Sequence, residues 1–248
     1  GKLRDLHERI MASGRSVLCA GLADDTDGLS QLLQMPARVQ ATRPAPRAHM
    51  TMPLPPENIA LVVSSQVNHC VIAWSAPNMR DPDAAALAVA AELISNQILH
   101  QSLREKGGAY GGAAVYSEEA GIFTMSSFRD PRLAETYQDF HAAVDQILTD
   151  DFSEEALEEA IICVIKRLDK PLSPRAQAME AWNLYQRGGS QVLRQQFRSA
   201  VLECKLAHVK VAVQRWLKNG IASRAAATGK VDQDLAGLGP LDLLELAG

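Results

Sequence analysis

The sequence lacks the charge patterns and apolar runs that mark binding to nucleic acids or insertion into membranes. Its formal net charge is −4, and acidic and basic residues are mixed along the chain without a basic cluster. No run of about 18 apolar residues is present, which is the length that a membrane-spanning helix requires. The N-terminus has no signal-peptide pattern. We therefore expect neither nucleic acid nor a membrane among the partners of this chain.

Cysteine pairs and metal-ligand motifs are missing as well. The four cysteines are far apart, and none belongs to a Cys-x-x-Cys pair, so a structural zinc site is not predicted. Isolated cysteines of this kind are typical of small buried residues in a reducing compartment. Neither His-Glu-x-x-His nor His-x-x-Glu-His occurs, and the six histidines stand singly. The residues alone predict no metal site and no cofactor in this chain.

The usual nucleotide-binding and hydrolase motifs are also absent. The glycines within 107–112 are not followed by Lys-Ser or Lys-Thr, which a Walker loop requires, and they do not have Gly-x-Gly-x-x-Gly spacing. No Gly-x-Ser-x-Gly nucleophile elbow occurs. The sequence thus contains no recognisable nucleophile–base pair.

The composition nevertheless supports a folded core, because 47% of the 248 residues are hydrophobic. Strand patterns occupy 58–76, a hairpin formed by 109–116 and 121–129, and a final stretch at 222–228. Asp81-Pro82, Asp130-Pro131, Ser153 and Ser173-Pro174 are typical helix starts, and further helices are predicted at 2–12, 190–202 and 205–218. Strands followed by a run of helices predict an α+β domain, with helices on one face of a mainly antiparallel sheet.

A proline-rich segment at 35–57 is predicted to be a long loop or a linker. The roughly 34 residues before it cannot bury a core alone, so we expect a single domain over 1–248. The chain has no initiator methionine and opens inside a helical pattern. We therefore expect it to be a piece of a longer protein.

The stretch from Arg104 to Gly112 (REKGGAYGG) is the most unusual part of the chain, since four glycines surround Tyr110. A helix end needs one glycine, and the others would let another backbone approach closely. Arginine can hold peptide carbonyls, and a tyrosine hydroxyl can donate to a developing oxyanion. The alternative is structural: an arginine that complements a helix dipole and a tyrosine that begins a strand. The residues alone leave both interpretations open.

The segment LREKGGAYGGAA and the following GIFTMSSFRDPRLAETY resemble the C-terminal half of the pitrilysin/insulinase family of zinc metallopeptidases. The presequence protease branch is the most similar. The shared pattern is an arginine, five residues and a tyrosine in a glycine-rich turn, followed by a Ser-Phe-Arg-Asp-Pro entry into a helix. The resemblance covers roughly residues 55 to 190. Within this range, the spacing of the motif and the elements that flank it both agree with the family pattern.

The resemblance implies a half-clamshell α+β domain, the C-terminal domain of a zinc metalloendopeptidase that degrades peptides. By this resemblance Arg104 holds the substrate backbone, and Tyr110 binds the scissile carbonyl and stabilises the tetrahedral intermediate. The substrate would lie along Gly107, Gly108, Ala109 and Gly111. Zinc is expected in the longer protein, in an N-terminal half that this chain lacks. The peptide substrate and that half are the expected partners, and this chain alone is expected to be inactive.

Two other functions remain open from the sequence. The chain could be a non-catalytic subunit of the same fold, or a peptide-binding module that pairs an exposed strand edge with an extended peptide. The expected compartment is the cytoplasm. The alternative is the mitochondrial matrix or another organelle, which would require a transit peptide upstream of this chain.

Overall fold

The computed structural model describes residues 1–12, 57–229 and 242–245. The chain divides into two compact units, one from residues 1–49 and 171–189 and the other from residues 50–170 and 190–248. Nearly all of the predicted proline-rich loop at 35–57 lies outside the described residues. The single domain predicted over 1–248 stays a prediction.

Two helices are described in the first unit, and both were predicted. Helix α1 spans Lys2–Ala12 and buries none of its residues. Helix α6 spans Pro174–Gln186. The Ser173 hydroxyl accepts a hydrogen bond from the Ala176 amide at 3.3 Å, and Pro174 occupies the first turn. This is the N-terminal cap that the sequence predicts.

The second unit contains a sheet in the order β3-β4-β2-β5-β1-β6. The pairs β3–β4, β4–β2 and β2–β5 are antiparallel, whereas β1 lies parallel to both β5 and β6. The strands are β1 Asn58–Val62, β2 Asn68–Ser75, β3 Gly111–Ser117, β4 Ile122–Asp130, β5 Ala222–Thr228 and β6 Asp242–Glu245. The sheet is therefore mainly antiparallel, as predicted, while β6 was not predicted.

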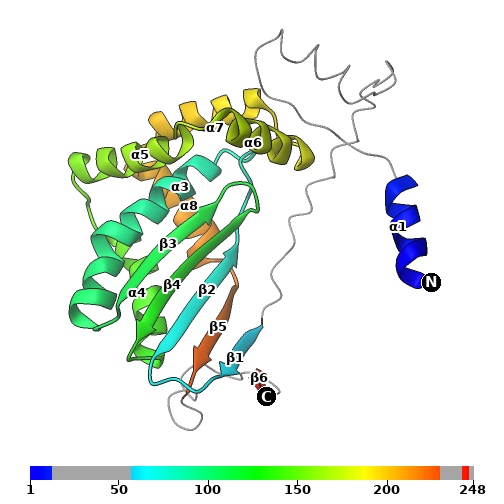
Figure 1. The fold of residues 1–248 in the computed structure, drawn as a ribbon. Coiled ribbons are helices and arrows are strands. Elements are labelled where there is room, and N and C mark those ends of the chain that lie inside the picture. Colours follow the sequence, from blue (N-terminus) through cyan, green and yellow to red (C-terminus); the bar gives the residue numbers. More distant parts are fainter. Residues whose placement is uncertain (13–56, 230–241, 246–248) are drawn as a thin grey trace. The chain divides into compact units, whose positions relative to one another are not determined.

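The helices of the second unit lie on one face of this sheet (Figure 1). They are α3 Ala84–Leu93, η1 Ile94–Lys106, α4 Ala134–Thr149, α5 Glu154–Leu168, α7 Gln191–Leu202, α8 Leu206–Val213 and η2 Gln214–Lys218. Cys70, Ile72 and Trp74 alternate along β2 and are buried against them. The residues between these positions face the other side, because successive side chains of a strand point to opposite faces. The predicted α+β class is confirmed.

Two predicted helix starts are displaced. Helix α3 begins at Ala84, because the Asp81 carboxylate accepts from the Asp83 amide at 2.8 Å in a preceding turn. Helix α4 begins at Ala134, since Asp130 is the last residue of β4. The buried Asp130 carboxylate accepts hydrogen bonds from the Arg132 amide at 2.9 Å and the Thr136 hydroxyl at 2.7 Å. It thus organises the turn before the helix from inside the core.

The α3 helix continues without a break as the wider π-helix η1, which ends at Lys106, just before Gly107. Turns of π-helix are rare in proteins, and many of those that occur lie at functional sites. Ser95, near the start of η1, bonds to the middle of edge strand β3. Its hydroxyl accepts from the Ala114 amide at 2.8 Å and donates to the Ala114 carbonyl at 3.0 Å. These bonds fix the start of η1 relative to the sheet.

The three described cysteines are expected to differ in their reactivity towards alkylating reagents. Burial raises the pKa of Cys70 to about 12 and that of Cys204 to about 11. Both thiols thus stay protonated at pH 8. They react slowly there, because the nucleophile is the thiolate and not the thiol. Cys163 is less buried. In a Cys19→Ser background, iodoacetamide at pH 8 is expected to alkylate Cys163 at least about tenfold faster than the other two. Mass spectrometry of labelled peptides measures this, and equal rates at all three cysteines would contradict it.

Candidate functional site

Arg104 lies in the last turn of η1, where its side chain is exposed. The amides of Gly107 and Gly108 both donate a hydrogen bond to the carbonyl oxygen of Arg104. Gly108 then reverses the chain with a φ of 76°, a conformation that glycine adopts without strain. The guanidinium of Arg104 makes no ion pair or hydrogen bond with any residue that the structure describes. The main chain of this arginine is fixed, while its donors remain available to a ligand.

Tyr110 lies between η1 and β3, just before the strand in which it was predicted. Its amide donates to the Arg129 carbonyl at 3.4 Å. The side chain is 71% exposed, and its ring contacts Phe128 edge-on with the centroids 6.0 Å apart. Within the described part of the chain the hydroxyl has no hydrogen-bond partner. It can therefore donate to a ligand, as the oxyanion role requires.

The glycines of this stretch have different reasons to be glycine. A Cβ on Gly107 would lie 1.9 Å from the Arg132 guanidinium, and one on Gly112 would lie 2.3 Å from a methyl of Leu103. Close packing thus explains both. Gly111 differs, because a Cβ there would have no atom within 4 Å. Its φ is not positive either. The fold gives no reason for the glycine at 111.

Of the residues predicted to line the substrate, Gly107 and Ala109 are buried, whereas Gly108 is exposed and Gly111 is partly exposed. The Ala109 amide donates to the Leu103 carbonyl at 2.9 Å, so this amide is already engaged. Below the turn, Arg132 bonds to Asp139 at 2.9 Å and fills the space that Gly107 leaves. Of the predicted site residues, a ligand can therefore reach Arg104, Gly108, Tyr110 and Gly111.

Sequence reasoning missed the ring beside Tyr110 and the next ring beyond it. Phe128 is 50% exposed on β4, and its ring also contacts His69 of β2, with the centroids 4.7 Å apart. His69 is partly buried on β2. Phe128 belongs to the Ser-Phe-Arg-Asp-Pro segment, which was the signal available in the sequence. Its position beside Tyr110 depends on strand pairing.

The described residues contain no group of three or more histidine, cysteine, aspartate or glutamate side chains that could hold a metal ion. The zinc of the pitrilysin/insulinase family therefore does not fit the described part of this chain. A search of the same residues for helices long and apolar enough to cross a membrane also finds none.

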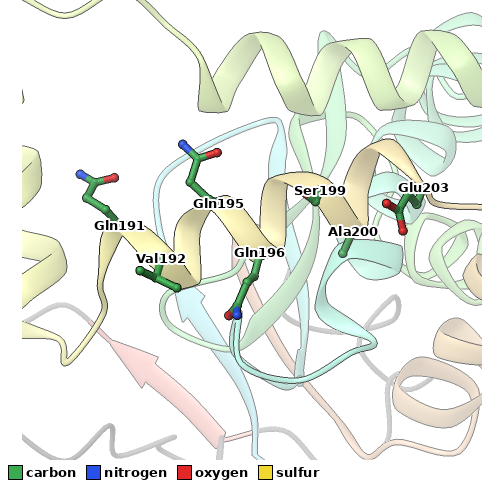
Figure 2. A pocket seen from close by; sticks show the side chains of 7 residues that line it. All are labelled: Gln191, Val192, Gln195, Gln196, Ser199, Ala200 and Glu203. Carbon is green, nitrogen blue, oxygen red and sulfur yellow. The ribbon is translucent and has the colours of Figure 1, made fainter.

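A separate hollow of about 610 Å³ runs along α7 (Figure 2). Its lining residues come from this helix and from the residue that follows it: Gln191, Val192, Gln195, Gln196, Ser199, Ala200 and Glu203. Glu203 is the only charged residue among them, and no histidine or cysteine accompanies it. The hollow has no cation and no histidine or lysine that could activate Ser199, so Arg104 and Tyr110 remain the better candidates for chemistry.

Comparison with known proteins gives a consistent result. Residues 2–162 match the family model described as the peptidase M16 inactive domain. The chain is 34% identical over 164 residues to the mitochondrial presequence protease of Yarrowia lipolytica, covering 66% of this chain and 16% of that protein. The mitochondrial presequence protease of Mus musculus is 36% identical over 160 residues, covering 64% of this chain and 14% of that protein.

A solved structure has the same fold. The peptidase M16 inactive domain from Pseudomonas fluorescens superimposes with a TM-score of 0.57, covering 71% of this chain and 44% of that one. Its sequence identity is 18%, so this likeness concerns the fold alone. The two presequence proteases are matched over only 14–16% of their own length. The present chain corresponds to one part of such a protein.

Proposed function

Since this chain belongs to the peptidase M16 family, as a domain of the inactive type found in presequence protease-like proteins, we propose that it clamps peptide substrates for a zinc metalloendopeptidase. Arg104 and Tyr110 carry this proposal. Both are exposed on a main chain that is fixed by hydrogen bonds, and neither side chain uses its polar groups within the described structure. Polar groups that the fold does not use are available for a ligand.

The metal belongs to another part of the longer protein in this proposal, because the described residues offer no ligand set. Zinc supplies the activated water for hydrolysis in such enzymes. The present chain contributes binding and orientation. The Arg104 guanidinium donates to carbonyl oxygens of the extended peptide. The Tyr110 hydroxyl donates to the scissile carbonyl oxygen, and this bond strengthens as the oxygen becomes negative.

Closure of the zinc-bearing half over this chain would complete the site. A site that is assembled by closure excludes water and commits the substrate. Both presequence proteases are named as mitochondrial proteins, which supports an organelle as the compartment of the longer protein. A cytoplasmic location stays the prediction from the sequence.

The peptide-binding module receives less support than the clamp. Binding by strand addition needs unpaired backbone groups along a sheet edge. At the middle of edge strand β3, the amide and the carbonyl of Ala114 are both bonded to Ser95. A peptide strand cannot pair there unless Ser95 releases them.

Arg104→Ala provides the test of the proposal. In the longer protein, this change is expected to raise KM for peptide hydrolysis by about 10- to 100-fold, because a hydrogen bond to a charged group contributes about 1.5–3 kcal/mol. Steady-state kinetics on a fluorogenic peptide measure it. Lys106→Ala is the matched control, since Lys106 is a cation in the same turn, and its KM should stay within about twofold. Equal effects of the two changes would contradict the proposal.

A further inference from the structure

We propose that Phe128 and His69 form an apolar subsite beside Tyr110, which receives a large apolar side chain of the peptide next to the scissile bond. This inference rests on the proposed function and deepens it. It assigns a substrate class to the surface that adjoins the proposed catalytic tyrosine.

The first observation is a β-bulge at the end of β4. Asn68 pairs with Asp130, and Cys70 pairs with Ser127, so both Phe128 and Arg129 stand opposite His69. The extra residue shifts the alternation of β4. Phe128 and Arg129 are consecutive and exposed, and the next buried residue is Asp130. Bulges of this kind are frequent next to active sites, where they redirect side chains.

The bulge is strained, and the core holds it in place. Arg129 has a φ of 51°, which is unfavourable for a residue with a side chain. The Asn68 amide group donates to the Asp130 carbonyl at 3.2 Å and to the Arg132 carbonyl at 2.9 Å. Its oxygen accepts from the buried Thr228 hydroxyl at 2.6 Å. This network fixes the turn just beyond the bulge. The backbone of Phe128 is therefore held in the conformation that exposes its side chain.

The second observation is a row of rings that is continuous with Tyr110. The Tyr110 and Phe128 centroids lie 6.0 Å apart, and those of Phe128 and His69 lie 4.7 Å apart. Both pairs meet edge-to-face, which leaves ring faces available to a third group. Aromatic rings favour such arrangements and bind apolar side chains well. A peptide held at Tyr110 would therefore place a neighbouring side chain against Phe128.

The third observation is the space beside Phe128. Gly111 is directly opposite Phe128 in the β3–β4 pairing. Neither packing nor φ requires a glycine at this position. Cross-strand neighbours normally cover one another on the same face of a sheet. A side chain at 111 would cover the Phe128 ring, and the glycine leaves it open.

The charge of the surroundings selects the occupant. Arg129 of the bulge is the one charged residue beside Phe128 on β4. The other residues of β2, β3 and β4 on the face that the helices leave uncovered include no lysine, arginine, aspartate or glutamate: His69, Val71, Ala73, Ser75, Gly111, Ala113, Val115, Ser117, Ile122, Thr124, Ser126 and Phe128. A lysine or arginine side chain would lose hydration here without gaining an anionic partner among these residues. An aromatic or large aliphatic side chain would gain from leaving water.

The test uses the longer protein and two peptide series, in which the residue on one or the other side of the scissile bond is Phe, Leu, Ala or Asp. We expect the wild type to cleave the Phe peptide with a kcat/KM at least about tenfold above the Ala peptide in one series. Phe128→Ala should reduce that ratio to about twofold or less. Gly111→Val, which fills the space without an expected clash, should do the same. Phe128→Leu serves as a milder variant should the alanine variant fail to fold.

Val115→Ala is the matched control, because Val115 is exposed on the same face but pairs with Thr124, farther along β4. Its Phe-to-Ala ratio should equal that of the wild type. An unchanged ratio in both Gly111→Val and the Phe128 variants would overturn the subsite. If Tyr110→Phe is impaired in the same assays, the proposed function survives that result. If Tyr110→Phe cleaves like the wild type, the proposed function fails as well.

Discussion

Tyr110→Phe in the longer protein is expected to lower kcat for peptide hydrolysis by about 10²- to 10³-fold. The change removes only a hydroxyl that would donate to the oxyanion of the tetrahedral intermediate. KM should change much less, because the bond is strongest in the transition state. The free energy of unfolding should stay within about 0.5 kcal/mol, since the side chain is 71% exposed and its hydroxyl has no partner in the described structure.

Tyr116→Phe is the matched control for this experiment. The Tyr116 hydroxyl donates to the Pro77 carbonyl at 2.5 Å inside the core. Its removal should lower the free energy of unfolding by about 1 kcal/mol and leave kcat near the wild-type value. Urea denaturation and steady-state kinetics of both variants give the comparison. A Tyr110→Phe variant that is destabilised but fully active would favour the structural interpretation of this tyrosine.

Gly112→Ala is expected to lower the free energy of unfolding by about 3 kcal/mol. The new Cβ would lie 2.3 Å from a methyl of the buried Leu103 and 3.0 Å from the Ser126 carbonyl oxygen. Leu103 cannot move away easily, because its side chain is fully buried where η1 packs against the sheet. Overpacking of this kind displaces backbone as well as side chains.

Gly111→Ala is the matched control, one residue earlier. It should leave the free energy of unfolding unchanged or raise it by up to about 1 kcal/mol, because alanine restricts the unfolded chain and meets nothing in the fold. Urea denaturation of the two variants of this chain decides the question. Equal stability of the two would show that η1 does not pack on β3 as closely as described.

The sequence predicted the parts of the fold that depend on local pattern. The alternation along β2 follows from its side chains, and the caps at Ser153 and Ser173 follow from serine chemistry. The displaced start of α4 depends instead on tertiary structure. Asp130 is buried in the core by its place at the end of β4, although the Asp-Pro pair is typical of an exposed cap. Such tertiary effects override local propensity.

The candidate site divides in the same way. Arg104 and Tyr110 were found from residue types and spacing, and their assignment to catalysis stays a proposal. Phe128 and His69 could not be found in this way, because their meeting requires the β2–β4 register and its bulge. Nothing local in Phe128-Arg129 predicts a bulge, since the residue with positive φ is an arginine rather than a glycine.

The central claim is that this chain supplies catalytic groups to a site whose zinc is held elsewhere. The most direct test compares bound zinc and peptide hydrolysis in the longer protein and in its Arg104→Ala/Tyr110→Phe double variant. The account predicts the same zinc content in both, with kcat/KM lower by at least about 10³-fold in the double variant. Hydrolysis at the wild-type rate by the double variant would contradict it.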